Sequence, residues 1–117
     1  MRGSMLRGVI TTAAVGASLV LAAPVAMAEP SSVTCSMSYC DLWDVTDFPG
    51  GTLSVDADVH GVGIGRWTVW GPNDYRCENT FHASAGPGSW LCHNAPAGTY
   101  NARVEGPQGD TNIGLRW

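Results

Sequence analysis

The chain has 117 residues, with six basic and ten acidic side chains and a formal net charge of −4 at pH 7. All six basic residues are arginine, and they form no basic stripe. Nucleic acids and anionic membranes are bound by cationic side chains that neutralise phosphate groups. The composition therefore excludes nucleic acid as an expected partner, and it argues against a membrane partner for the mature form.

The first 28 residues have the features of a signal peptide. Arg2 and Arg7 precede an apolar run over residues 9–23, and Ala26-Met27-Ala28 gives the small-x-small pattern that signal peptidase accepts. The apolar run is shorter than the roughly 20 residues of a membrane-spanning helix, and no charged stop-transfer segment follows it. We therefore expect residues 29–117 to form a single secreted, extracellular domain. Its net charge is −6, because four arginines and all ten acids remain.

The cysteines predict a disulfide-stabilised domain. All four, Cys35, Cys40, Cys77 and Cys92, lie after the signal peptide, and an even number in an exported chain predicts two disulfides. Four cysteines allow three connectivities, and the sequence alone does not choose among them. We favour the local pairing, Cys35 with Cys40 and Cys77 with Cys92. The second pair is expected on neighbouring strands of one antiparallel hairpin, where Cα atoms about 5–6 Å apart suit a disulfide.

The mature chain has the pattern of an all-β domain. It contains no stretch of helical periodicity, and short alternating segments are separated by glycine- and proline-rich turns. The clearest segment is 52–59, where Leu53, Val55, Ala57 and Val59 alternate with polar residues. We expect an antiparallel β-sandwich of about seven or eight strands. In chain order, the expected strands cover residues 33–39, 42–47, 52–59, 66–70, 75–82, 89–93, 99–105 and 112–117.

Five tryptophans follow the signal peptide: Trp43, Trp67, Trp70, Trp90 and Trp117. Most aromatic side chains of so small a domain are expected in its core. Alternation along the strand places Trp67 on the inward face, and Trp90 and Trp117 are also predicted to point inward. Trp70 falls on the opposite face at the end of its strand, so we predict that it is exposed.

An exposed Trp70 defines the candidate binding site. With Arg66, Asn73 and Tyr75 it would form a flat aromatic platform with polar edges, a surface that suits a sugar ring or a protein contact. The alternative is that Trp70 covers a sheet edge or packs beneath a loop.

No residue pattern indicates catalysis, a metal or a cofactor. His60, His82 and His93 lack the spacing of a zinc site, and adjacent strand residues such as Cys92 and His93 point to opposite faces. No serine stands in a Gly-x-Ser-x-Gly elbow. Asp56 and Asp58 share a strand face, where a two-carboxylate site is the alternative to our interpretation of them as solvated surface groups. We predict that the chain is not an enzyme.

A series of motifs after residue 51 carries a family resemblance. The motifs are Thr52-Leu53-Ser54-Val55, Trp67-Thr68-Val69, Cys77, Cys92, Pro96-Ala97-Gly98-Thr99-Tyr100, Asn101-Ala102-Arg103-Val104-Glu105-Gly106 and Ile113-Gly114-Leu115. Their order resembles the bacterial pre-peptidase C-terminal domain, a jelly-roll-like β-sandwich appended to secreted peptidases. The resemblance covers about residues 51–117 and implies a bacterial accessory module.

One position departs from that family. The family commonly has a glycine-aspartate-x-aspartate element before the tryptophan strand, and this chain has Gly63-Ile64-Gly65-Arg66 there. Calcium needs several oxygen ligands. We therefore expect no calcium site at this position.

Together these patterns predict a secreted, non-catalytic binding module that contacts polysaccharide or an extracellular protein. Two alternatives remain. A secreted inhibitor of an extracellular hydrolase would use the loop at 71–75 or the loop at 85–89. An antimicrobial or cell-surface effector is the other, although membrane-disrupting peptides are usually cationic.

Overall fold

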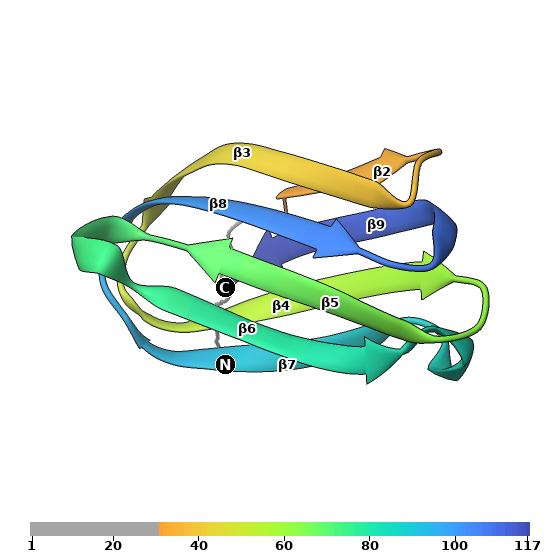
Figure 1. The fold of residues 1–117 in the computed structure, drawn as a ribbon. Coiled ribbons are helices and arrows are strands. Elements are labelled where there is room, and N and C mark those ends of the chain that lie inside the picture. The colour runs from red at the N-terminus through yellow and green to blue at the C-terminus, as the bar shows by residue number, and fades with distance from the viewer. Residues whose placement is uncertain (1–30) are drawn as a thin grey trace, which may run out of the picture.

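The computed structural model describes residues 31–117, which form two antiparallel β-sheets stacked on each other (Figure 1). One sheet has the strand order β2-β9-β4-β7 and the other has the order β3-β8-β5-β6. The strands are β2 (Ser31–Cys35), β3 (Tyr39–Phe48), β4 (Gly51–His60), β5 (Ile64–Trp70), β6 (Arg76–His82), β7 (Gly88–Ala95), β8 (Gly98–Glu105) and β9 (Gln108–Arg116). Short 3-10 turns, η2 (Pro72–Asp74) and η3 (Ala83–Ala85), follow β5 and β6. The predicted small all-β domain is confirmed; the predicted signal peptide lies outside the described residues.

The chain crosses from one sheet to the other at almost every connection. Among the strands of residues 31–117, only β5 and β6 are both consecutive along the chain and hydrogen-bonded to each other. The first described strand, β2, pairs with the last, β9. Each sheet is therefore assembled from segments that lie far apart in the sequence.

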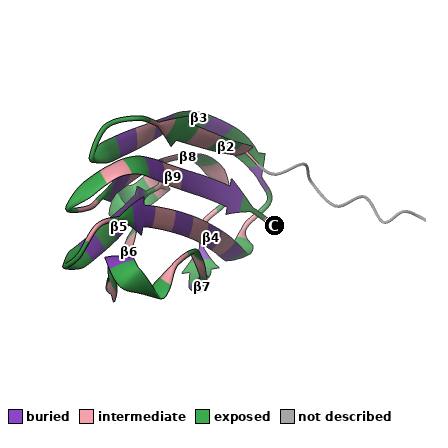
Figure 2. Cartoon of the chain, turned by 90° about the vertical axis from the view of Figure 1, so that its right-hand side faces the viewer, coloured by how far each residue is buried: buried purple, intermediate pink, exposed green. Residues whose placement is uncertain are grey.

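The core lies between the two sheets, where the inward residues of each strand meet. Figure 2 shows the resulting alternation of buried and exposed positions along the strands. The alternation predicted for 52–59 is confirmed, because Leu53, Val55, Ala57 and Val59 are all buried. Trp67 is buried at the centre of β5, and the partly buried Trp90 packs against it with ring centroids 5.7 Å apart. Trp117 packs against Phe48 at 5.2 Å, so all three tryptophans predicted to point inward contact the core.

The two disulfides have the predicted pairing but not the predicted setting. Cys77 bonds to Cys92, with Cα atoms 6.1 Å apart, and Cys35 bonds to Cys40. The expectation that Cys77 and Cys92 lie on neighbouring strands of one hairpin is wrong, because β6 and β7 belong to different sheets. Both disulfides therefore join the sheets: one links the edge strands β2 and β3, and the other links the edge strands β6 and β7.

Most strand limits differ from the predicted ones by a few residues, and one prediction merges two elements. The segment predicted at 33–39 contains a turn, because β2 ends at Cys35 and β3 begins at Tyr39 in the other sheet. Near the C-terminus, β9 begins at Gln108 and not at the predicted residue 112, because Gln108 pairs with His60 on β4. Pairing between distant strands therefore decides these boundaries. Among the described residues there is no helix of the length and apolarity needed to cross a bilayer.

Candidate binding face

Trp70 lies at the end of β5 with its side chain on the outer side of the sheet. The Trp70 residue is 38% exposed to solvent, whereas Trp67, three residues earlier, is 1% exposed. This division between the two tryptophans was predicted and is confirmed. The guanidinium carbon of Arg76 on β6 lies 5.9 Å from the Trp70 ring centroid, within cation–π distance. Arg76 therefore supports the ring from the edge strand.

A second tryptophan, Trp43, lies on the same outer face and was not included in the predicted site. It is 64% exposed. Leu42 pairs with Ala102 and Val45 pairs with Tyr100, so Trp43 and Asp44 both stand opposite Asn101. This is a β-bulge, a local feature that redirects side chains.

The bulge is fixed by a hydrogen bond across the strands. Asp44 has a positive φ of 56°, and its backbone N–H donates to Asn101 Oδ1 at 2.8 Å. The same Asn101 pairs with Trp70 on its other side. Trp43, Asn101 and Trp70 therefore form one row across β3, β8 and β5, and we call the outer surface around this row the tryptophan face.

The bulges in β3 leave a signal in the sequence. Leu42, Val45 and Phe48 are all buried and are spaced by three residues, where a regular strand would repeat every two. Each interval therefore contains one extra residue, and register shifts occur in both intervals. Strict alternation could not tell which side of the sheet Trp43 occupies. The three-residue spacing of the apolar side chains on either side of it is the signal in the sequence that indicates the bulge.

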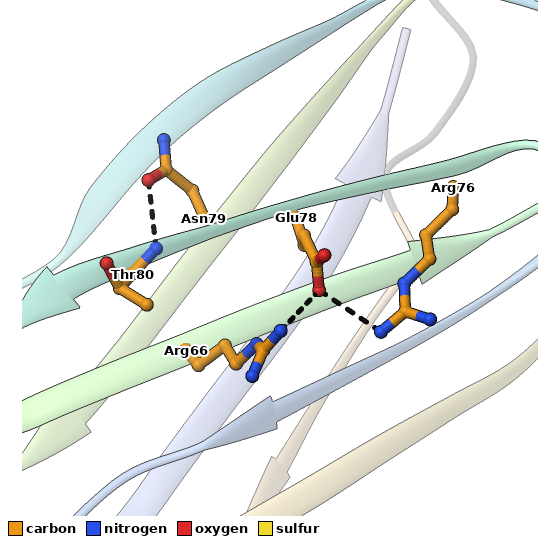
Figure 3. Close-up of polar contacts among 5 residues, drawn as sticks. All are labelled: Arg66, Arg76, Glu78, Asn79 and Thr80. Atoms are coloured by element: carbon orange, nitrogen blue, oxygen red, sulfur yellow. Dashed lines mark hydrogen bonds and ion pairs between the residues drawn. The ribbon is translucent and has the colours of Figure 1, made fainter.

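The charged groups of this sheet form ion pairs with one another. Arg66 and Arg76 both approach Oε1 of Glu78, at 2.7 and 3.2 Å (Figure 3). The hydrogen bond from Arg66 is the main cause that lowers the pKa of the Glu78 carboxyl below its ordinary value of 4.5. On the neighbouring strands, Arg103 lies 3.2 Å from Asp41 and 3.7 Å from Glu105. Three arginines and three carboxylates thus offset one another beside the tryptophan face.

The edge strand β6 is partly protected against pairing with another chain. Asn79 Oδ1 accepts a hydrogen bond of 2.9 Å from the backbone N–H of Thr80 (Figure 3). An unpaired edge N–H is a point where another strand can add to a sheet. The N–H of Thr80 is therefore not available to a further strand.

The structure brings only some of the predicted site residues to the tryptophan face. Arg66 lies on the same side of β5 as Trp70, four residues earlier along the strand. Asn73 is exposed in η2 with a positive φ of 57°. Tyr75 turns inward instead: its ring packs 6.1 Å from that of the buried Tyr100, and its hydroxyl donates to the carbonyl of His93 at 2.9 Å. Tyr75 therefore has an aromatic partner and a hydrogen-bond acceptor on the inner side of the sheet, and its side chain does not lie beside Trp70 on the outer face.

The loop at 71–75 is held firmly beside Trp70. The Gly71 N–H donates to the Tyr75 carbonyl at 2.9 Å, and the Tyr75 N–H donates to the Pro72 carbonyl at 3.1 Å. Glycine is required at position 71, since a Cβ there would overlap the ring of Tyr100. The loop therefore projects Asn73 and Asp74 from a fixed base.

The opposite sheet has a polar outer face with a hollow of about 320 Å³, lined by Asp56, Ala57, Asp58, Pro87, Gly88, Ser89 and Asn112. Asp56 accepts two hydrogen bonds from Arg116, at 2.7 and 3.0 Å, and one from Ser89. Asp56 was predicted to be a solvated carboxylate, and the structure instead gives it these partners. Asp58 lies 4.0 Å from His60. His60, His82 and His93 are exposed, and within residues 31–117 no three metal-binding side chains converge on one point.

Two comparisons with known proteins found no match. No protein-family model matches the chain, and no curated protein matches it. The resemblance to the pre-peptidase C-terminal domain stays a prediction.

The ion pair of Asp56 predicts a pH-dependent contribution to stability. The hydrogen bond from Arg116 is the main cause that lowers the pKa of Asp56 below its ordinary value of 3.8. A lowered folded-state pKa stabilises the fold above the ordinary value, and this stabilisation is lost as the pH falls through the folded-state value. We expect Asp56→Asn to reduce the free energy of unfolding at neutral pH by less than about 1 kcal/mol, because the pair is partly solvated.

Urea unfolding at neutral pH and at a pH below both pKa values would measure this effect. The difference between Asp56→Asn and wild type should close at the acidic pH. Asp58→Asn on the same strand face is the matched control, since its carboxylate lacks the Arg116 contact. A difference for Asp56→Asn that stays constant with pH would contradict the assignment.

Proposed function

We propose that this chain is a secreted, non-catalytic binding module that contacts extracellular polysaccharide or a protein surface through the tryptophan face. The observation that carries the proposal is the exposure of Trp70 beside a second exposed tryptophan on one sheet face. Exposed aromatic side chains grouped on a small domain are typical of contact sites. Two disulfides fit an oxidising, extracellular environment, which supports secretion.

The composition of the face supports binding rather than catalysis. Three of its carboxylates, those of Asp41, Glu78 and Glu105, are engaged with arginines, and the histidines lie singly on the surface. A general acid or base needs a titratable group poised beside the reacting atoms. The ion-paired groups of this face are better suited to holding a fixed surface than to moving protons.

An adsorption experiment tests this function. The oxidised protein is incubated with cellulose, chitin and bacterial cell-wall material, and with immobilised extracellular proteins, and the unbound fraction is measured. We expect adsorption to one of them, weakened about tenfold in Trp70→Ala, as for a residue at the centre of a contact. Leu91→Ala is the matched control, because Leu91 is 57% exposed on β7 of the opposite sheet. Equal adsorption by wild type and Trp70→Ala would contradict the proposal.

A second candidate function, inhibition of an extracellular hydrolase, is favoured by the fixed loop at 71–75. A rigid projecting loop loses little conformational entropy on binding, which is a property of tight inhibitors. The test measures the activity of a panel of secreted proteases and amylases after this protein is added at a concentration equal to that of each enzyme. Inhibition that is lost in an Asn73→Ala, Asp74→Ala double variant, without adsorption to polysaccharide, would favour this candidate over a binding module.

A further inference from the structure

We infer that the ligand of the tryptophan face is an uncharged polysaccharide presented as a flat surface, held by Trp43 and Trp70 together. This inference rests on the proposed binding function and narrows its ligand class. It depends on the position of the two rings, on the polar group between them and on the charge of the surrounding residues.

The spacing of the two tryptophans suits an extended ligand. Trp43 is on β3 and Trp70 is on β5, with β8 between them. Neighbouring strands lie about 4.8 Å apart, so the two backbones are roughly 10 Å apart across the sheet. That span is longer than one sugar ring. A single monosaccharide could therefore stack on either tryptophan, whereas contact with both requires a chain that crosses the strands.

Asn101 supplies a polar group between the two rings. Its Oδ1 accepts the Asp44 N–H, which fixes the orientation of the amide. An asparagine amide also carries an NH₂ group with two donors. Aromatic rings that contact the C–H face of a sugar, with a hydrogen-bond donor between them that reaches a hydroxyl, form the mixed apolar and polar surface that carbohydrate ligands require.

The shape of the face favours a surface over a single chain end. The tryptophan face is the outer side of a β-sheet, and its two tryptophans come from separate strands of that sheet. The hollow near Asp56 lies on the opposite sheet. A ligand that is itself flat and repetitive can contact both rings without having to enter a groove.

The charges favour an uncharged polymer. Arg66 and Arg76 are engaged by Glu78, and Arg103 is engaged by Asp41 and Glu105. Asp44 adds a carboxylate next to Trp43. With Asp44 included, three arginines stand among four carboxylates, so a polyanionic glycan would be repelled both by this face and by the net negative charge of the chain. A neutral glycan meets neither obstacle.

The experiment compares insoluble and soluble forms of the same polymer. Wild type, Trp43→Ala, Trp70→Ala and the double variant are titrated onto microcrystalline cellulose and chitin, and into soluble oligosaccharides of each by calorimetry. Sodium alginate serves as an anionic polymer, and each titration is repeated at high salt. Leu91→Ala is again the matched control, and circular dichroism verifies that each variant folds.

The inference predicts adsorption to an insoluble neutral polymer that is insensitive to salt. Each single substitution should weaken adsorption about tenfold and the double substitution about a hundredfold, because each ring contributes separately. Soluble oligosaccharides should bind much more weakly than the insoluble polymer.

Two results would overturn the inference and leave the proposed function standing: adsorption that Trp43→Ala does not change, or salt-sensitive binding to alginate in preference to the neutral polymers. Failure to bind any polysaccharide, with the protein instead forming a dimer that Trp43→Ala or Trp70→Ala dissociates, would overturn the inference and assign the face to a second copy of the chain. The proposed function would also be overturned if the protein bound none of the soluble or insoluble polysaccharides and none of the immobilised extracellular proteins, and formed no dimer. In that case Trp70→Ala and wild type would show the same absence of binding.

Discussion

Replacing Trp67 by alanine is expected to lower the free energy of unfolding by about 3–5 kcal/mol, the range for loss of a large aromatic side chain from a core. Trp67 is 1% exposed at the centre of β5, and it packs against Trp90, which in turn lies 5.0 Å from Phe81. Alanine would leave a cavity between two sheets that disulfides hold together at both edges, so the walls can collapse only partly. Small domains have about 5–15 kcal/mol of stability in total, so the effect is large. Urea unfolding followed by circular dichroism would measure it.

Two variants make this test specific. Trp43→Ala removes the same side chain from an exposed position and should change stability by less than about 0.5 kcal/mol. Trp67→Phe should cost less than Trp67→Ala, because phenylalanine fills most of the site and removes the buried indole N–H, which has no hydrogen-bond partner among the described residues. If Trp67→Ala and Trp43→Ala had similar effects, Trp67 would not be the central core residue that the packing indicates.

Removing the Cys77–Cys92 disulfide by replacing both cysteines with serine should destabilise the domain by about 3 kcal/mol. The bond closes a loop with a sequence separation of 15, and the loss of chain entropy in the unfolded state accounts for roughly that amount. It also joins β6 and β7, which share no hydrogen bonds because they lie in different sheets. Without it, the open side of the sandwich at β6 and β7 keeps side-chain packing and the hydrogen bond from the Tyr75 hydroxyl to the His93 carbonyl. Thermal and urea unfolding of the double variant would measure the loss.

The other disulfide is the natural control for this prediction. Cys35 and Cys40 have a sequence separation of 5, so the same entropic argument gives about 2 kcal/mol for their removal. We therefore expect the variant that lacks Cys77–Cys92 to be the less stable of the two. The reverse order would show that loop length does not control the contribution of these bonds.

The outward or inward direction of many side chains could be predicted from the sequence. Direction along a strand depends only on a period of two, which is a local property of the backbone. For this reason the burial of Leu53, Val55 and Trp67 and the exposure of Trp70 were all predictable. The same rule did not assign Trp43, since two residues oppose one at the β3 bulge and the period changes.

The partners of each strand could not be predicted in the same way. Neighbouring strands in a sequence often form a hairpin, and that expectation placed Cys77 and Cys92 in one sheet. The chain instead changes sheets after β6, so the bond spans the sandwich. Whether a connection turns back within its sheet or crosses to the other depends on which apolar faces can be buried together, a property of the whole domain.

The sequence by itself determined the class of the domain and the side on which Trp70 lies, because each depends on composition or on short-range periodicity. It left three cysteine connectivities open, and the structure confirms the local pairing that we favoured. The tertiary structure alone decided that both disulfides join the two sheets, that Tyr75 turns inward to His93 and Tyr100, and that Trp43 aligns with Trp70 across Asn101. These are contacts between residues far apart in the chain, and register between distant strands brings them together. The candidate binding surface is therefore a product of strand order, which no single segment of the sequence encodes.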